Sequence, residues 1–251
     1  MQPSKMPRVW SLSDLHLRTR RLMHDGWVDH EARIEKEWRR RVGPYDLVLV
    51  PGDLTFAHSN PHPDLLALHQ LPGQKVLVMG NHDGWCKGLD RRKLKALLEL
   101  YPTLHMLSHD YLTYETGPHL IVGYEGADPP DSPNFRRRAH RHALAQAQRA
   151  VEAATHVRAS FHKVIVMTHF PPSEEERRIL APLKADLWLH GHCHLGGDDE
   201  PLVSGWLERT SPAQHCVSAD YLDMAPVEVT HGVVHTTPPL YVDRAPRPAI
   251  A

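Results

Sequence analysis

The chain has 251 residues, and its hydrophobic content of 41% is enough to bury a sizeable core in one large domain. A formal net charge of -1 excludes a strongly basic overall surface for gripping long nucleic acid. The three cysteines, Cys86, Cys193 and Cys216, are too widely spaced for a disulfide framework or a CxxC zinc pair, which is typical of a reducing cytosol.

The N-terminal region reaches its first apolar run at residue 9 without the long apolar segment of a signal peptide. No segment of the sequence approaches the roughly 20 apolar residues that a membrane-spanning helix needs. We therefore expect a cytoplasmic protein that does not contact a membrane. Length and composition carry no signal for an oligomeric state or a partner protein.

Short apolar runs and helical periodicities alternate along the chain. The runs are rich in Val, Ile and Leu, which favours strands buried on both faces. They fall at residues 9–12, 47–50, 76–79, 120–122, 164–167 and 187–189. Between them, apolar residues at helical spacing predict helices around 34–42, around 94–101 and across about 135–160.

This alternation of strand and helix predicts an α/β architecture. Residues 216–229 are candidates for closing strands, and the proline-rich tail from about residue 237 is expected to end as coil. No internal repeat or clear linker divides the sequence. A single domain over residues 1–251 is therefore the simplest organisation.

Five groups of metal-ligand residues follow the apolar runs in one fixed order. They are Asp14-Leu15-His16, Gly52-Asp53, Gly80-Asn81-His82-Asp83, His169, and Gly191-His192-Cys193-His194. Each lies where a strand gives way to a loop, and in open α/β folds ligands bind beyond the carboxyl ends of the strands. Two aspartates, one asparagine and four histidines from these groups are enough to hold two divalent cations side by side.

Residues two apart in an extended segment point the same way. Asp14 and His16 are therefore expected to bind one ion together. By the same geometry His192 and His194 could serve adjacent ions, with Cys193 directed away from them. The sequence thus predicts that both pairs use extended backbone.

Each group taken alone has an ordinary explanation. Asp14 is suited to cap a turn, Asp53 to lie in a loop, and residues 81–83 to form a polar turn, while His169 resembles a satisfied core or surface histidine. Most of the 21 histidines lie in polar stretches and are expected at the solvated surface. The ligand interpretation comes from the groups occurring together and in order. His190 is outside the pattern and is expected to be structural or to support a ligand.

The order Asp-x-His, Gly-Asp, Gly-Asn-His-Asp, a lone His and Gly-His-x-His resembles the calcineurin-like metallophosphoesterase superfamily. The match runs from Asp14 to His194, which is most of the chain, and the stretches at 47–53 and 80–85 are similar to a bacterial branch of predicted phosphohydrolases. The resemblance implies a metallophosphoesterase-type four-layer α/β/β/α sandwich with the site at strand-end loops. The strand pattern alone does not distinguish that sandwich from a single open sheet.

The resemblance also implies which residues would hold two divalent metal ions. Asp53 would bridge both ions, since a carboxylate has two oxygens to share. The other ligands form one set for each ion, namely Asp14, His16 and His194 for the first and Asn81, His169 and His192 for the second. Mixed imidazole, carboxylate and amide ligands suit Mn, Fe, Co, Ni or Zn better than Ca or Mg alone, and manganese is the expected ion for activity.

Two such cations, about 3.5–4 Å apart, lower the pKa of the water between them. The resulting metal-bridging hydroxide would attack phosphorus in line with the departing alcohol, while the ions neutralise charge on the phosphoryl oxygens. His82 is the candidate proton donor to the leaving oxygen, or a charge stabiliser when protonated, and Asp83 is the candidate group to orient or support it. The chain is therefore expected to be a metal-dependent phosphoesterase.

The loops after the motifs are expected to choose the substrate. Arg18, Arg20 and Arg21 are candidates to meet a second phosphate, Trp85 to stack on a base or ring, and residues 124–134 to cover the site, and each has a plain surface role as its alternative. We expect small phosphodiesters or nucleotides as substrates. A phosphomonoesterase, including a protein phosphatase, is the alternative.

Three basic runs, at residues 39–41, 91–93 and 136–138, keep nucleic acid open as a substrate. They would suit a single-strand nuclease, whereas the near-neutral net charge weighs against a duplex nuclease. The run at 136–138 is more simply a solvated helix face. A non-enzymatic scaffold is disfavoured, because it would be expected to lack ligands or the motif histidine His82.

Overall fold

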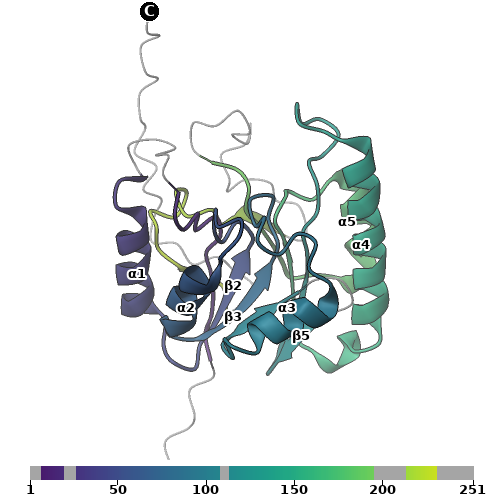
Figure 1. Cartoon of the computed structure of the whole chain (residues 1–251). Coiled ribbons are helices and arrows are strands. Elements are labelled where there is room, and N and C mark those ends of the chain that lie inside the picture. The colour runs from purple at the N-terminus through teal and green to yellow at the C-terminus, as the bar shows by residue number, and fades with distance from the viewer. Residues whose placement is uncertain (1–6, 20–26, 108–112, 195–212, 231–251) are drawn as a thin grey trace, which may run out of the picture.

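The computed structural model describes residues 7–19, 27–107, 113–194 and 213–230. In these ranges the chain forms two five-stranded sheets, with helices on the outer side of each (Figure 1). A layer of buried apolar side chains from both sheets lies between them. The arrangement is the four-layer α/β/β/α sandwich that the resemblance implied, and not a single open sheet.

The first sheet has the strand order β10-β1-β2-β3-β4. Strands β1 to β4 run parallel, and β10 pairs antiparallel with β1. The strands are β1 (Val9–Ser11), β2 (Leu47–Pro51), β3 (Gln74–Val78), β4 (Leu104–Met106) and β10 (Val227–Glu228). The helices between the parallel strands are α1 (His30–Arg41), α2 (His62–Gln70) and α3 (Arg91–Leu98).

The second sheet has the strand order β5-β6-β7-β8-β9. Strands β6 to β9 run parallel, and β5 pairs antiparallel with β6. The strands are β5 (Thr113–Thr116), β6 (His119–Tyr124), β7 (Lys163–Thr168), β8 (Leu187–His190) and β9 (Ala213–Cys216). The helical segments are α4 (Arg137–Thr155), η2 (Arg158–Ser160), α5 (Glu174–Leu180) and η3 (Ala181–Leu183).

Each central strand is buried on both faces, which explains its continuous apolar sequence. In β2, Val48 and Val50 pack on the helix side of the sheet, and Leu47 and Leu49 pack between the two sheets. Strand β7 repeats this division, with alternate residues in the two layers. Because apolar neighbours cover both faces of these strands, their continuous apolar sequences are stable in the interior.

All six predicted strands and all three predicted helices are present, with shifted ends. The helix expected across 135–160 is α4 followed by the short turn η2, and β10 lies inside the 216–229 segment. The structure adds β4, β5, β9, α2 and α5, each of nine residues or fewer. The tail from residue 237 lies outside the described residues. In the part of the chain that is described, no helix is long and apolar enough to cross a membrane.

Candidate metal centre

The predicted ligands meet at the carboxyl ends of strands from both sheets. The first sheet contributes the loops after β1, β2 and β3, and the second contributes the loops after β7 and β8. Hydrogen bonds join these loops: the amide of Asp14 donates to the carbonyl of Gly52 at 3.1 Å, and the amide of His192 donates to a carboxylate oxygen of Asp14 at 3.1 Å. The site is therefore built from loops of both sheets.

The backbone at the ligands is left-handed rather than extended. Asp14, His16, Asp53 and His192 have φ angles of 54°, 43°, 52° and 68°. Such angles are uncommon outside glycine and cluster at functional sites, where the surroundings hold the strain. The expectation of extended pairs was therefore wrong in its geometry. Asp14 and His16 still face one centre, where their ligand atoms group with that of His194.

Two glycines let the loops approach the carboxylates closely. A Cβ at Gly80 would lie 2.1 Å from Oδ1 of Asp53, and one at Gly191 would lie 2.3 Å from Oδ2 of Asp14. Contacts this short are not tolerated, so only glycine allows the loops after β3 and β8 to pack against the two aspartates.

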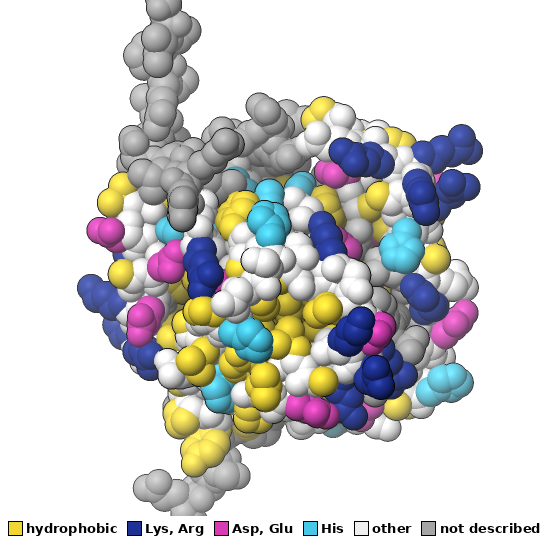
Figure 2. Space-filling view, in the orientation of Figure 1, with side chains coloured by type: hydrophobic (Ala, Val, Ile, Leu, Met, Phe, Trp, Pro, Cys, Tyr) yellow, Lys and Arg dark blue, Asp and Glu magenta, His cyan; other side chains and the backbone are white. Residues whose placement is uncertain are grey.

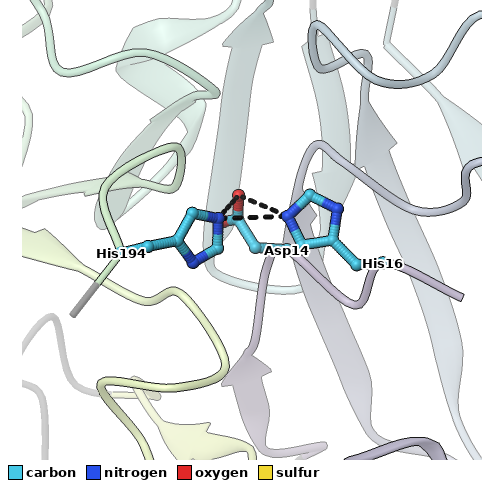
Figure 3. A group of neighbouring side chains, drawn as sticks. All are labelled: Asp14, His16 and His194. Atoms are coloured by element: carbon cyan, nitrogen blue, oxygen red, sulfur yellow. Dashed lines mark hydrogen bonds and ion pairs between the residues drawn. The ribbon is translucent and has the colours of Figure 1, made fainter. Parts of the chain in front are cut away.

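The first cluster consists of Asp14, His16 and His194 (Figure 3). Nε2 of His16 lies 3.1 Å from Nε2 of His194, and Oδ1 of Asp14 lies 3.8 Å and 3.5 Å from these two nitrogens. The ligand atoms of all three residues lie within 4.8 Å of one another. One cation placed among them would contact all three.

The second cluster is centred on the amide oxygen of Asn81. This Oδ1 lies 2.7 Å from Nε2 of His169 and 3.1 Å from Nδ1 of His192. Asp53 completes the cluster, with its Oδ1 3.5 Å from the same nitrogen of His169. The structure thus brings together the seven residues that the sequence singled out as ligands.

Asp53 lies between the two clusters. Its Oδ1 faces His169 in the second cluster, and its Oδ2 lies 3.8 Å from Nε2 of His16 in the first. The residue is 1% exposed, so water does not solvate its charge. A carboxylate in this position offers one oxygen to each side.

Burial controls the protonation of these groups. It lowers the pKa of both His16 and His169 to about 3, so both imidazoles are neutral, as metal ligands must be. It raises the pKa of Asp53 well above the ordinary value, and the nearby charges of Asp14 and Asp83 add to the effect. A cation beside Asp53 would reverse that shift by stabilising the ionised carboxylate.

His194 behaves differently because two carboxylates flank it. Burial alone would lower its pKa, but hydrogen bonds to Asp14 and Asp220 outweigh burial and raise the pKa to about 11. A proton therefore occupies the place where a cation would balance these acids. Buried oxygen and nitrogen donors of this kind, with excess negative charge, fit divalent transition metals.

His82 and Asp83 have different surroundings. The side chain of His82 is 42% exposed, and its Nε2 lies 3.9 Å from Oδ2 of Asp53. The carboxylate of Asp83 is buried and accepts hydrogen bonds from the amides of Gly80, Leu54 and Thr55 and from the indole of Trp85. The bonds from Leu54 and Thr55 tie the loop after β3 to the loop after β2, those from Gly80 and Trp85 lie within the loop after β3, and none of the four goes to the His82 ring.

Two of the expected substrate contacts are already used inside the protein. The guanidinium of Arg18 pairs with Asp64 at 2.7 Å, which holds the loop after β1 against α2. Trp85 is 5% exposed and packs in the core on the outer side of the first sheet, so it does not offer a surface for stacking. Arg20 and Arg21 lie outside the described residues.

Two of the three basic runs contain side chains that lie near acids on or beside their own helices. Arg39, Arg40 and Arg41 pair with Glu35 and Glu37 of their own helix. In the 91–93 run, Lys93 lies 3.9 Å from Asp90, one turn away on the same helix. The run at 136–138 is exposed at the start of α4, where Figure 2 shows basic side chains gathered at the upper right. A solvated helix face is the simpler interpretation of all three.

The sequence did not reveal several residues around the ligands. Ser13 and Ser218 donate hydrogen bonds to Oδ2 of Asp14 at 2.5 Å and 3.0 Å. Phe56 lies beside His82, with ring centroids 4.6 Å apart. Asp128 and Asp220 approach the outer nitrogens of His192 and His194 at 3.5 Å and 3.3 Å. Residues that support a ligand carry no motif of their own, because any nearby segment can supply them. His190 is buried and bonds to the carbonyl of Gly191.

Comparisons with known proteins agree with this arrangement. The model of the calcineurin-like phosphoesterase family matches residues 7–196. The Gene 66 proteins of Mycobacterium phages L5 and D29 are each 35% identical to this chain, over 85 and 82 residues, which cover 32% and 31% of the chain and 41% of each phage protein. The chain therefore spans about two fifths of the length of these curated relatives.

The crystal structure of phosphopantetheinyl hydrolase from Mycobacterium tuberculosis has a similar fold. It is 15% identical, with a TM-score of 0.53, over 87% of this chain and 91% of that one. The two structures share the class of a sandwich of two sheets flanked by helices. Within that class, the chain belongs to the calcineurin-like phosphoesterase family.

Proposed function

We propose that the chain hydrolyses phosphoesters with two divalent cations, and that manganese is the ion for activity. One observation carries the proposal: the two oxygens of Asp53 face different clusters, at 3.5 Å from His169 and 3.8 Å from His16. A buried carboxylate shared in this way suits a bridging ligand. The same position would be costly if no cation balanced it.

The other ligands follow from the two clusters. Asp14, His16 and His194 would hold one ion, and Asn81, His169 and His192 would hold the other, with Asp53 shared. Bound there, two cations supply a hydroxide nucleophile at neutral pH and neutralise charge on the phosphoryl oxygens. The buried side chains of Asp14, Asp53, His16 and His169 would hold the ions away from bulk water.

His82 is the proposed proton donor to the leaving oxygen. Its side chain is 42% exposed, yet its Nε2 lies 3.9 Å from Oδ2 of Asp53. It therefore lies where a substrate enters and a leaving group departs. Asp83 is proposed to position His82 by holding the loop after β3, since its carboxylate bonds to the backbone of both neighbouring loops.

Small phosphodiesters or nucleotides are the proposed substrates. The arginines of the 39–41 run pair with acids of their own helix, and Lys93 lies near Asp90, which lowers the positive charge that these two runs offer to a long nucleic acid. Phe56 places a flat apolar ring 4.6 Å from that of His82, and could take the stacking role that the sequence suggested for Trp85. A base or another ring on the leaving group could rest against it.

The first experiment compares two substrates on metal-stripped protein. Bis(p-nitrophenyl) phosphate and p-nitrophenyl phosphate are assayed with and without added manganese. We expect manganese-dependent turnover that favours the diester. Preference for the monoester would overturn the diester assignment and redirect the search to phosphomonoesters. Absence of turnover of either substrate with two ions bound would overturn the proposed activity.

The bridging role is tested by Asp53→Asn. The amide keeps the shape of the side chain but loses the charge that both ions share, so both ions are expected to bind more weakly. Metal content after dialysis against a fixed manganese concentration measures this directly. Two ions retained per chain would show that Asp53 does not bridge. Asp186→Asn, at an ion pair with Lys163 on the second sheet, is the matched control and is expected to keep both ions.

A further inference from the structure

The two histidines of the last motif present opposite nitrogens to the centre. Nδ1 of His192 faces inward, 3.1 Å from Oδ1 of Asn81. For His194 the inward atom is Nε2, 3.1 Å from Nε2 of His16 and 3.5 Å from Oδ1 of Asp14. A neutral imidazole binds a metal through the nitrogen that carries no proton. The two rings therefore need opposite tautomers.

A separate carboxylate lies against the outward nitrogen of each ring. Oδ1 of Asp128 lies 3.5 Å from Nε2 of His192, and Oδ1 of Asp220 lies 3.3 Å from Nδ1 of His194. Both acids are themselves held in place: the hydroxyl of Ser132 donates to Asp128 at 3.0 Å, and the amide of Tyr221 donates to Asp220 at 3.1 Å. Asp220 makes a hydrogen bond with the outer nitrogen of His194, and Asp128 lies at ion-pair distance from that of His192, so the charge of each carboxylate favours a proton on the nitrogen beside it.

These carboxylates come from segments outside the five motifs. Asp128 lies in the loop between β6 and α4, and Asp220 follows β9. The side chain of Asp220 is fully buried, and that of Asp128 is 19% exposed. His169 has a different partner, since its Nδ1 lies 3.0 Å from the backbone carbonyl of Pro51. Among these three histidines, only His192 and His194 of the last motif therefore have a carboxylate beside the outward ring nitrogen.

We propose that Asp128 and Asp220 are positioning residues, each dedicated to one of the two cations, an inference that rests on the proposed two-ion function. Asp128 fixes the tautomer and orientation of His192 for the ion also held by Asn81 and His169. Asp220 does the same for His194 at the ion held by Asp14 and His16. A carboxylate behind a ligating histidine also raises the basicity of the nitrogen that binds the metal.

Manganese binding to the full-length chain tests the proposal without any substrate. Asp128→Asn and Asp220→Asn keep the side-chain shape and remove the charge. Each is expected to lower the affinity for one of the two ions by about 10- to 100-fold and to leave the affinity for the other unchanged. Asp131→Asn, in the same exposed loop as Asp128, and Asp223→Asn, at an exposed ion pair with Arg33, are matched controls with wild-type binding.

Combined variants show which ion each acid serves. Asn81→Ala is expected to abolish the second ion. Adding Asp128→Asn to it should then change nothing further, whereas adding Asp220→Asn should weaken the ion that remains. In a His16→Ala background, adding Asp220→Asn should change nothing further, whereas adding Asp128→Asn should weaken the binding of the ion that remains. If both acids affected the same ion, or if neither changed binding, the proposal would be overturned.

Nitrogen NMR of the zinc-loaded chain reads the tautomers directly. In the wild type, we expect the proton of His192 on Nε2 and that of His194 on Nδ1. Asp128→Asn should perturb the His192 signals and leave those of His194 unchanged. Wild-type protein that binds fewer than two ions would contradict the proposed function. If the wild type and both variants each bound two ions and kept the same tautomers, only the positioning role of Asp128 and Asp220 would be contradicted.

Discussion

His82 combines exposure with closeness to the centre in a way that the ligands do not. Its ring contacts Phe56 and lies 3.9 Å from Asp53, while its backbone amide donates to Oδ1 of Asp53 at 2.8 Å. The backbone and the side chain therefore have separate tasks. The amide helps to hold the carboxylate of Asp53, and the exposed ring is the proposed proton donor.

His82→Ala removes the ring and keeps the amide. We expect kcat to fall by about 10²- to 10⁴-fold, because proton donation to the leaving oxygen is lost. Manganese content should remain at the wild-type level, since the hydrogen bond from the amide to Asp53 is retained. Steady-state kinetics together with metal analysis check this. An unchanged kcat with metals bound would show that His82 is not the proton donor.

Glu125 provides a pH-dependent contribution to stability. Burial raises its pKa to about 7; Lys87 opposes the shift and Asp83 adds to it. Between the unfolded value of 4.5 and about 7, the folded chain binds the additional proton. The contribution of Glu125 to the free energy of unfolding therefore decreases as pH rises through this window.

Glu125→Gln removes that titration. Relative to the variant, the wild type should lose free energy of unfolding as pH rises from 4.5 to 7. Urea unfolding of metal-stripped protein at several pH values measures the difference. A difference that stayed constant, or moved in favour of the wild type, would contradict the raised pKa.

At the scale of single elements, a strand or helix could be predicted where its own residues carry a clear apolar pattern. The strands could be predicted because both of their faces are buried, and the long helix α4 because its apolar residues recur at helical spacing. Helix α2 could not, because it has nine residues and a weak apolar face. Strand β5 could not, because its sequence Thr-Tyr-Glu-Thr is polar and its side chains are only partly buried.

The loop after β8 depends on Gly191. A Cβ there would lie 2.3 Å from Asp14 and 2.7 Å from the hydroxyl of Ser13, so Gly191→Ala should displace Asp14 and weaken manganese binding at the first cluster. Gly117→Ala is the control, because its Cβ would meet open space although its φ is +52°. It should cost roughly 1–2 kcal/mol of stability and leave metal affinity unchanged. Titration with manganese separates the two effects.

Helix α5 begins with a capping box. The hydroxyl of Ser173 accepts from the amide of Glu176, whose carboxylate accepts from the amide of Ser173 at 2.9 Å. Ser173→Ala should destabilise the chain by about 1 kcal/mol, and Ser160→Ala, at an exposed position, should have little effect. Chemical denaturation measures both variants. Equal stability of the two would show that the cap does not contribute.

At the scale of the whole molecule, the proposed ions join the two sheets. Asp14, Asp53 and Asn81 follow strands of the first sheet, and the three histidines 169, 192 and 194 follow strands of the second. Cations that bind only the folded arrangement stabilise it by mass action. The metal centre is thus expected to act as a cross-link between the halves of the sandwich.

Thermal unfolding with and without manganese tests that cross-link. At about 100 times the dissociation constant each ion should add about 2.7 kcal/mol, which corresponds to roughly 5–10 °C in Tm for a chain of this size. Asn81→Ala should show a smaller rise, because it lacks a ligand of the second cluster. Sodium chloride at equal ionic strength controls for salt. A Tm that does not depend on manganese would argue against ions bound between residues of the two sheets.

The sequence by itself determined the types of ligand, their order and their places at strand ends, since buried parallel strands have a local apolar signature and deliver their ends to one edge. Only the tertiary structure decided the pairing of the two sheets, the left-handed turns at Asp14 and Asp53, and the burial of Trp85. It also decided which nitrogen of His192 and His194 faces inward. These features depend on contacts between segments far apart in the chain, and no local pattern of residues encodes such contacts.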